Sequence, residues 1–222
     1  MSEASHQIAL ARPAKGWRGG VLCGLREADD LSLPVAGLVV LNVGGSLLSR
    51  PDWPALFASL MAACGSRSCC LVVGGGAVVD GLRVLDRAVP QSPQVMHDLA
   101  IDAMRLTARL VAAAMSLPLA ATPPDDDGAV VLDVPSWLGI GSRATTLPVG
   151  WQVTSDTIAA RVAVEHGASL LLAKSVPPPP CPGDGDHLAT LARAGWVDEY
   201  FPVAARPLVT IEWAAPDLAS RL

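Results

Sequence analysis

The chain has 222 residues, which is enough for one α/β domain and short for two. Its 16 Lys and Arg against 21 Asp and Glu give a formal charge of −5. Without a basic run, this balance argues against nucleic acid and anionic membrane surfaces as partners. Hydrophobic residues make up 51% and charged residues 17%, which excludes the composition of a disordered chain. Only two of the 16 cations are lysines, Lys15 and Lys174.

The cellular setting is predicted from the apolar stretches and the cysteines. Residues 31–49 carry no charge, but Pro34, Asn42 and the pair Gly44-Gly45 favour a loop, a buried strand and a glycine turn over a membrane span. The N-terminus lacks the basic start and apolar run of a signal peptide. Five cysteines form no CxxC pair and no metal-binding spacing. We therefore expect reduced thiols, a cytoplasmic protein and no structural metal site.

In chain order, residues 1–36 form a predicted N-terminal extension with a short strand or hairpin near residues 20–25. Short apolar runs then alternate with helical patterns over residues 37–222, which predicts a single α/β domain. Apolar runs predict strands at 38–41, 70–73, 129–134, 169–173 and 208–212. Helices are predicted at 52–64, 77–88, 95–115 and 156–167. The pattern is that of a three-layer αβα sandwich around a mainly parallel sheet.

Two predicted strand-to-helix junctions are rich in glycine. Gly44-Gly45-Ser46 follows the first strand of the domain, and Gly74-Gly75-Gly76 follows the second. Glycine lets backbone N–H groups approach an anion at a helix N-terminus, although tight packing is the other common reason for such turns. In an open parallel sheet both turns lie at the carboxyl edge, so we interpret them as a phosphate site. Neither a Rossmann glycine pattern nor a P-loop is present.

A third polar element, Thr154-Ser155-Asp156, opens the helix predicted at 156–167. One interpretation is an N-cap with a carboxylate that matches the helix dipole. The other is a carboxylate that orients a lysine or a metal beside phosphate. Local sequence leaves both open.

The order of these three elements resembles the amino acid kinase family. The family's first turn typically has the pattern K-[IV]-G-G-S, and here the residues are Asn42-Val43-Gly44-Gly45-Ser46. Its second turn, V-x-G-G-G with a downstream arginine, is matched by residues 73–76 and Arg83, and its third element by residues 154–157. Within the family, residues 94–104, 171–176 and 194–201 are most similar to a branch that phosphorylates an aminomethylfuran phosphate in C1-carrier biosynthesis.

The resemblance implies an ATP- and Mg²⁺-dependent kinase of a small metabolite, and it assigns a role to each candidate residue. Gly44, Gly45 and Ser46 would hold the transferring phosphoryl group, and Lys174 and Ser175 would lie where the strand at 169–173 leads into the nucleotide loop. Gly74, Gly75, Gly76 and Arg83 would bind the acceptor, with Thr154 and Ser155 beside it. Asp156 would orient the cation and help organise metal. His97 would face the acceptor pocket as a base or donor, or serve as a structural residue.

Two hypotheses follow from where the chain departs from the family pattern. Asn42 replaces the first-strand lysine, residues 177–180 are four prolines where the family often has V-D-G, and no lysine follows Lys174. The first hypothesis is a kinase in which Arg83, Lys174 and Mg²⁺ replace the missing lysine. The second is a catalytically silent anion-binding or assembly protein. The long helix at 95–115, with apolar residues three and four apart, also suits a homo-oligomer interface.

Overall fold

The computed structural model describes residues 17–22, 37–141, 143, 146–180 and 186–216. Within them a seven-stranded sheet has the order β1-β7-β6-β2-β3-β5-β4, and it is parallel except for the antiparallel β1–β7 pair. The strands are β1 (Trp17–Val21), β2 (Leu38–Val43), β3 (Ser68–Val73), β4 (Leu119–Ala120), β5 (Ala129–Leu132), β6 (Ser169–Ala173) and β7 (Ile211–Pro216).

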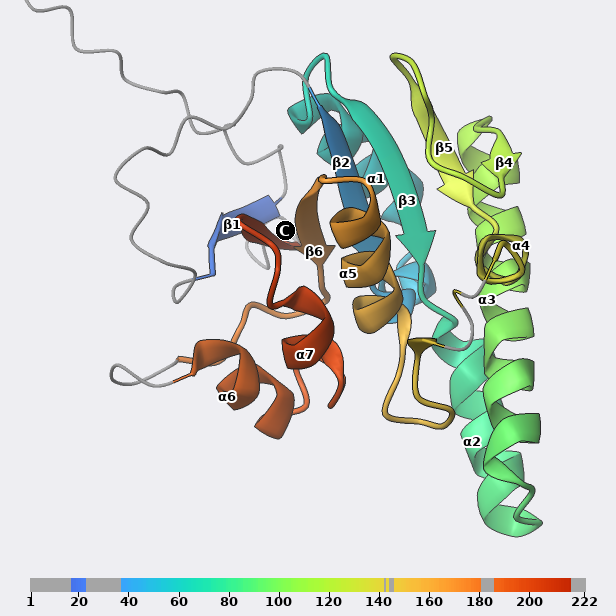
Figure 1. Ribbon diagram of the computed structural model, residues 1–222. Helices are drawn as coiled ribbons and strands as arrows, with labels where there is room; N and C mark the ends of the chain where they lie inside the picture. Colours follow the sequence, from blue (N-terminus) through green and yellow to red (C-terminus); the bar gives the residue numbers. More distant parts are fainter. Residues whose placement is uncertain (1–16, 23–36, 142, 144–145, 181–185, 217–222) are drawn as a thin grey trace, which may run out of the picture.

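Helices lie on both faces of this sheet (Figure 1). They are the 3₁₀ helix η1 (Gly45–Ser49) and α1 (Trp53–Ala63), α2 (Gly76–Ala88), α3 (Pro93–Met115), α4 (Val134–Leu138), α5 (Ser155–Glu165), α6 (His187–Arg193) and α7 (Phe201–Ala205). The predicted mainly parallel αβα architecture is confirmed.

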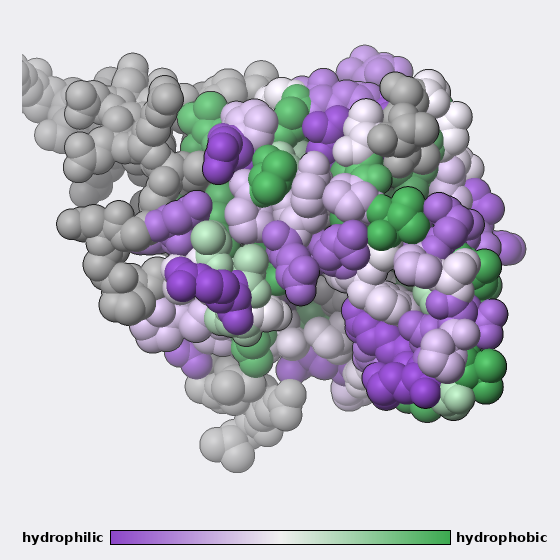
Figure 2. All heavy atoms as spheres, turned by 60° about the horizontal axis from the view of Figure 1, so that its bottom comes forward, coloured by the Kyte–Doolittle hydropathy of each residue, from purple (hydrophilic) through white to green (hydrophobic). Residues whose placement is uncertain are grey.

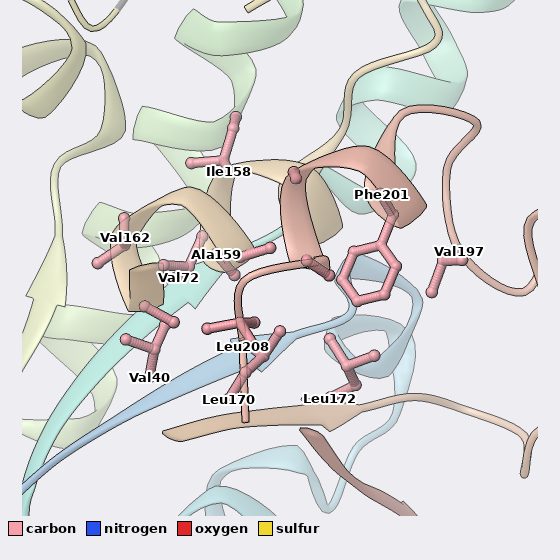
Figure 3. Close-up of a cluster of buried hydrophobic side chains, with 14 of the residues drawn as sticks. Val40, Val72, Ile158, Ala159, Val162, Leu170, Leu172, Val197, Phe201 and Leu208 are labelled. Carbon is pink, nitrogen blue, oxygen red and sulfur yellow. The ribbon is translucent and has the colours of Figure 1, made fainter. Parts of the chain in front are cut away.

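The pleat of the central strands divides their side chains between two cores. Val40, Val72 and Leu170 face α5 and α7, where Ile158 and Phe201 pack against them (Figure 3). Their neighbours along the strands, such as Val39, Leu41 and Leu71, face α1 on the other side of the sheet. Continuous apolar runs are the expected pattern for strands buried on both faces.

Several predicted boundaries move in the structure. The closing strand is β7 at 211–216, not 208–212. The third predicted strand ends at Leu132 because Asp133 and Pro135 start α4, a helix that was not predicted. Strand β1 begins at Trp17, before the predicted 20–25 region, and residues 23–25 lie outside the described residues. The residues 17–21 of the predicted extension thus form the sheet's edge strand.

The long helix α3 buries a different stripe from the one its leucines indicate. Leu99, Leu106 and Leu110 are exposed, whereas Ala103 of the same pattern is buried. The buried stripe runs through smaller and more flexible residues: Met96, Ala103, Met104, Thr107, Ala108, Val111 and Ala112. Ala108, Val111 and Ala112 of this stripe belong to the same buried cluster as strand residues such as Leu71 and Val131.

Cysteines and membrane spans can be assessed only in the described part of the chain. Cys64, Cys69 and Cys70 are free and buried there. Burial raises the pKa of the Cys70 thiol to about 12, which keeps it protonated and unreactive. Among the described helices, none is both long and apolar enough to cross a membrane.

Candidate functional site

The carboxyl ends of β2, β3 and β6 meet in the middle of the sheet because these strands are adjacent in the order β6-β2-β3. A cleft with a volume of about 250 Å³ opens there. Figure 2 faces the side toward which these strands point, and apolar side chains there form small separate areas between hydrophilic ones.

Twelve of the fourteen predicted site residues line this one cleft. They are Gly44, Gly45, Ser46, Gly74, Gly75, Gly76, Arg83, His97, Thr154, Ser155, Asp156 and Lys174. The structure thus brings together residues that are up to 130 positions apart in the sequence. Asn42 and Ser175 do not line the cleft. Ser175 lies at its margin, where it accepts a hydrogen bond from Ser46 Oγ at 3.2 Å.

The two glycine turns pack directly on each other. A Cβ added to Gly45 would lie 2.1 Å from the backbone nitrogen of Gly76, and one on Gly74 would lie 2.8 Å from the nitrogen of Gly45. Gly76 also has a φ of +53°, a left-handed conformation that favours glycine. Packing alone therefore requires glycine at these positions. The turns nevertheless leave the N-terminus of α2 without a side-chain cap, so its first amides face the cleft region unpaired by side chains.

A partly buried ion pair lies beside these turns, with the Asp156 side chain 6% and the Lys174 side chain 16% exposed. Lys174 Nζ donates to both oxygens of Asp156, at 2.6 and 2.7 Å, and Asp156 sits in the first turn of α5. Asn42 Nδ2 donates to Asp156 Oδ1 at 2.5 Å. The Lys174 ammonium also lies 5.5 Å from the centre of the Trp196 ring, whose Nε1 donates to the carbonyl of Val176. These contacts fix a single cation at the edge of the cleft.

Asn42, which replaces the first-strand lysine of the family pattern and was a candidate catalytic residue for that reason, does not line the cleft. Its side chain is completely buried beneath Asp156 rather than exposed to the cleft. Its Oδ1 is buried and has no hydrogen-bond partner among the described residues. Asn42 therefore acts on the cleft only through Asp156, to which its neutral amide donates a hydrogen bond where a lysine would bring a positive charge.

A carboxylate that was not predicted, Asp198, holds the N-terminus of α5. It accepts hydrogen bonds from the backbone nitrogens and hydroxyls of Thr154 and Thr157, and from the backbone nitrogen of Phe201. Burial and the nearby Asp156 charge raise the pKa of Asp198, against the lowering effect of these donors. No local pattern links residues 154–157 to a residue more than 40 positions away. The only sequence signal was its place within the family-like stretch 194–201.

The predicted arginine, Arg83, lies seven residues along α2 from Gly76 and also lines the cleft. Arg83 pairs with Asp80 at 2.9 Å and lies 5.0 Å above the centre of the Trp151 ring. Trp151 in turn donates from Nε1 to Asp86. His97 Nδ1 lies within 3.4 Å of the backbone nitrogen and oxygen of Gly150, so this ring both lines the cleft and holds a loop. The structure therefore places His97 in the cleft lining and gives it a structural contact, while its role toward an acceptor stays a prediction.

The resemblance implies ATP and Mg²⁺, and the cleft offers a phosphate group the ammonium of Lys174 beside two glycine turns. A Cβ on Gly44 would lie 3.7 Å from Lys174 Cδ and 3.1 Å from the carbonyl of Ala173, so glycine keeps open the space beside the lysine. No group of three or more His, Cys, Asp or Glu side chains forms a metal cage within the described residues. Both oxygens of Asp156, the buried carboxylate beside the glycine turns, are paired with the Lys174 ammonium, so Mg²⁺ at this place would be held mainly by substrate phosphates.

Solved structures with the same fold include two kinases. A uridylate kinase from Archaeoglobus fulgidus is 20% identical with a TM-score of 0.57, over 82% of this chain and 92% of that chain. An aspartate kinase from Synechocystis is 15% identical with a TM-score of 0.56, over 81% of this chain and 40% of that chain. No family model matches the sequence, and the curated proteins searched give no match. The likeness establishes the amino acid kinase fold.

Proposed function

We propose that this protein is an ATP-dependent phosphotransferase that acts on a small anionic metabolite. The observation that carries the proposal is the Lys174–Asp156 pair, held at 2.6 Å at the edge of a cleft that two glycine turns and the N-terminus of α5 enclose. Phosphoryl transfer depends mainly on positioning and on neutralising charge on the phosphoryl oxygens. A cation fixed by a carboxylate beside uncapped helix amides meets both needs.

In this proposal each residue has a role that follows from its position in the cleft. Lys174 stabilises the negative charge that develops on the transferring group, and Asp156 keeps its ammonium in position. The helix N-termini favour negative charge at the same place. Bound Mg²⁺ would supply further neutralisation of the phosphate oxygens. Arg83, which also lines the cleft, binds the anionic group of the acceptor.

The proposed active site is atypical because a neutral side chain supports the carboxylate. Asn42 and Lys174 both donate to Asp156, so the three side chains together carry no net charge. A lysine at position 42 would add a second cation in a completely buried position. The site therefore depends on one lysine where the family pattern has at least two.

The finer assignment is a phosphorylated or carboxylated acceptor of the kind found in C1-carrier biosynthesis, as in the aminomethylfuran phosphate branch. Two features support it. Arg83 offers an anion partner, and Ile101, Met104 and Val153 give the cleft an apolar wall that suits an organic body between two anionic ends. Turnover assays with each candidate acceptor, in competition with inorganic phosphate, rank the acceptors by how well they bind to the cleft.

Calorimetric titration with ATP–Mg²⁺ and a turnover assay test the function. We expect the native chain to bind nucleotide and Lys174→Gln to lose about 10³-fold in kcat, because one charged stabiliser of the transition state is removed. Arg87→Gln is the matched control, since Arg87 is an exposed cation in the last turn of α2. Absence of nucleotide binding to the native chain would overturn the proposal.

The second candidate is a catalytically silent anion-binding protein. One observation favours it: Lys174 is already neutralised by both oxygens of Asp156, and buried Asn42 brings no further charge. Phosphoryl transfer by the native chain that Asp156→Ala abolishes would exclude this candidate. Turnover that appears only in Asn42→Lys would establish it, as the signature of a decayed kinase.

Self-association through α3 is part of the proposal. Leu99, Leu106 and Leu110 are 41%, 57% and 53% exposed on one face of this helix. A two-fold axis near Leu106, with the two helices antiparallel, would place Asp102 of one copy opposite Arg109 of the other. In the described part of the chain neither of these two side chains forms an ion pair. The face is thus self-complementary in charge as well as apolar.

A further inference from the structure

We infer that Asp198 is a positioning residue that sets the orientation of Asp156, and through it the place of Lys174. Of the two tests of this inference, only the kinetic one rests on the proposed function. Asp198 lies outside the cleft lining, so it acts on the ligand through its neighbours.

The first step of the argument is the number and direction of the hydrogen bonds. Asp198 Oδ2 accepts from the backbone nitrogen and hydroxyl of Thr154, at 2.9 and 2.8 Å, and from the Thr157 nitrogen at 3.0 Å. Its Oδ1 accepts from the Thr157 hydroxyl at 2.5 Å and the Phe201 nitrogen at 2.8 Å. Five donors from three residues fix both oxygens of one carboxylate.

The second step is what these donors surround. Thr154 and Thr157 flank Asp156 on the first turn of α5, so anchoring both fixes the rotation of that turn about the helix axis. Thr154 is itself the N-cap, but its hydroxyl donates to Asp198 at 2.8 Å, shorter than the 3.4 Å at which it accepts from the Asp156 nitrogen. The helical turn that carries Asp156 is thus held from outside the helix, while its carboxylate contacts Lys174 and Asn42.

The third step is that the same segment also contacts the lysine. Trp196, two residues before Asp198, lies against the Lys174 ammonium and bonds the carbonyl of Val176. The loop before α7 therefore holds the carboxylate through Asp198 and the lysine through Trp196. An N-cap alone needs neither contact, which distinguishes this arrangement from ordinary capping.

An aspartate that only caps a helix is present in the same chain and serves as a control. Asp186 caps α6 with a single hydrogen bond from the Ala189 nitrogen at 3.0 Å, and it does not line the cleft. Asp186→Asn therefore reports the effect of altering a capping aspartate without changing the site. Asp198→Asn keeps the size of the side chain but places an NH₂ group where two donors point (at Oδ1) or three (at Oδ2). Thr157→Val removes one donor only and serves as a milder variant.

The kinetic arm compares kcat and KM for these variants. We expect Asp198→Asn to lower kcat by about 10²-fold, because a shift of about 1 Å in a catalytic group has that effect, with a smaller change in KM. Thr157→Val should show a smaller loss in kcat, and Asp186→Asn none. In an Asp156→Asn background the effect of Asp198→Asn should disappear, since the two residues act in series. Equal kcat for the native chain and Asp198→Asn would overturn the inference.

The second arm needs no activity, so it also separates failure of this inference from failure of the proposed function. The chain has two lysines, so carbon-13 labelling of lysine gives two side-chain signals, and the signal absent in Lys174→Arg is that of Lys174. We expect Asp198→Asn to move this signal, but to cause no further change in an Asp156→Asn background. A movement of the same size in both backgrounds would show an effect transmitted by Trp196 alone and would refute the inference.

Discussion

At the scale of single residues, Gly45 and Gly76 pack against each other so closely that neither has room for a side chain. Backbone atoms of the two turns occupy the space that a side chain at position 45 would need. The same two turns line the proposed phosphate site. Stability and binding therefore depend on the same glycines, and substitution there should affect both.

Gly45→Ala is expected to lower the free energy of unfolding by about 1–3 kcal/mol, because its Cβ would lie 2.1 Å from the Gly76 nitrogen and the turns would have to separate. Urea unfolding followed by tryptophan fluorescence measures the change. Gly81→Ala is the matched control, since nothing lies within 4 Å of its Cβ inside α2. It should raise the free energy of unfolding by about 0.5–1 kcal/mol. Equal effects of the two substitutions would contradict the packing argument.

The protonation of Asp198 gives a second prediction at this scale. Burial and the Asp156 charge raise its pKa above the ordinary value of 3.8, so the folded state binds the proton more tightly than the unfolded chain. Its contribution to stability is therefore full below pH 3.8 and is lost as the pH rises through the folded pKa. The free energy of unfolding of the native chain relative to Asp198→Asn should fall over that range. A relative stability that rises with pH would show that the five donors outweigh burial.

At the scale of elements, the edge strand β1 is held by one large side chain. Trp17 is buried, and its Nε1 donates to the carbonyl of Leu56 at 3.0 Å and to Ser59 at 3.2 Å. Both partners belong to α1, on the face of the sheet that includes Leu41 and Leu71. The strand therefore depends on contacts with a helix as well as on its pairing with β7.

Trp17→Ala should lower the free energy of unfolding by about 3–5 kcal/mol, the usual cost of truncating a buried tryptophan. Trp17→Phe keeps most of the apolar area and loses the two hydrogen bonds, so its cost should be smaller. Hydrogen exchange should show that the amides of β1 and β7 lose protection first. Unchanged stability of Trp17→Ala would mean that residues 17–21 contribute little to the domain.

Central elements were predictable because their signal is local. The runs at β2, β3 and β6 are apolar over their whole length, as strands covered on both faces must be. Strand β7 was misplaced because Leu208 is apolar and buried while belonging to the preceding loop. In α3, hydropathy alone does not show which stripe is buried, because the buried stripe includes small residues such as Ala103, Thr107 and Ala108.

At the scale of the whole molecule, the candidate site was predictable as a set of residues but not as a geometry. Parallel strands place their carboxyl ends on one edge, so Gly44, Gly74 and Lys174 had to come together. The burial of Asn42 beneath Asp156 depends on the face of the sheet to which its side chain points. That face follows from the register in which β2 pairs with its neighbouring strands. Asp198 was missed because its contacts join segments with no shared pattern. Long-range pairing of this kind is decided by topology alone.

The exposed face of α3 provides the last prediction, on assembly. If two copies pack through it, the native chain should have twice the 22.9 kDa mass of one chain in light scattering after size exclusion. Leu106→Glu should give the single-chain mass, because it places carboxylates face to face at the two-fold axis. Val209→Glu is the control, since Val209 is 78% exposed in the loop before β7, near the other edge of the sheet.

Charge exchange tests the antiparallel register of the same face. Asp102→Arg alone should weaken the dimer, because it places a second guanidinium opposite Arg109 of the other copy and like charges repel. The double variant Asp102→Arg with Arg109→Asp restores opposite charges across the axis and should restore the dimer. A parallel arrangement would bring identical positions together, so the double variant would then bind no better than the single one. A native chain that elutes with the mass of one copy at all concentrations would refute assembly through α3.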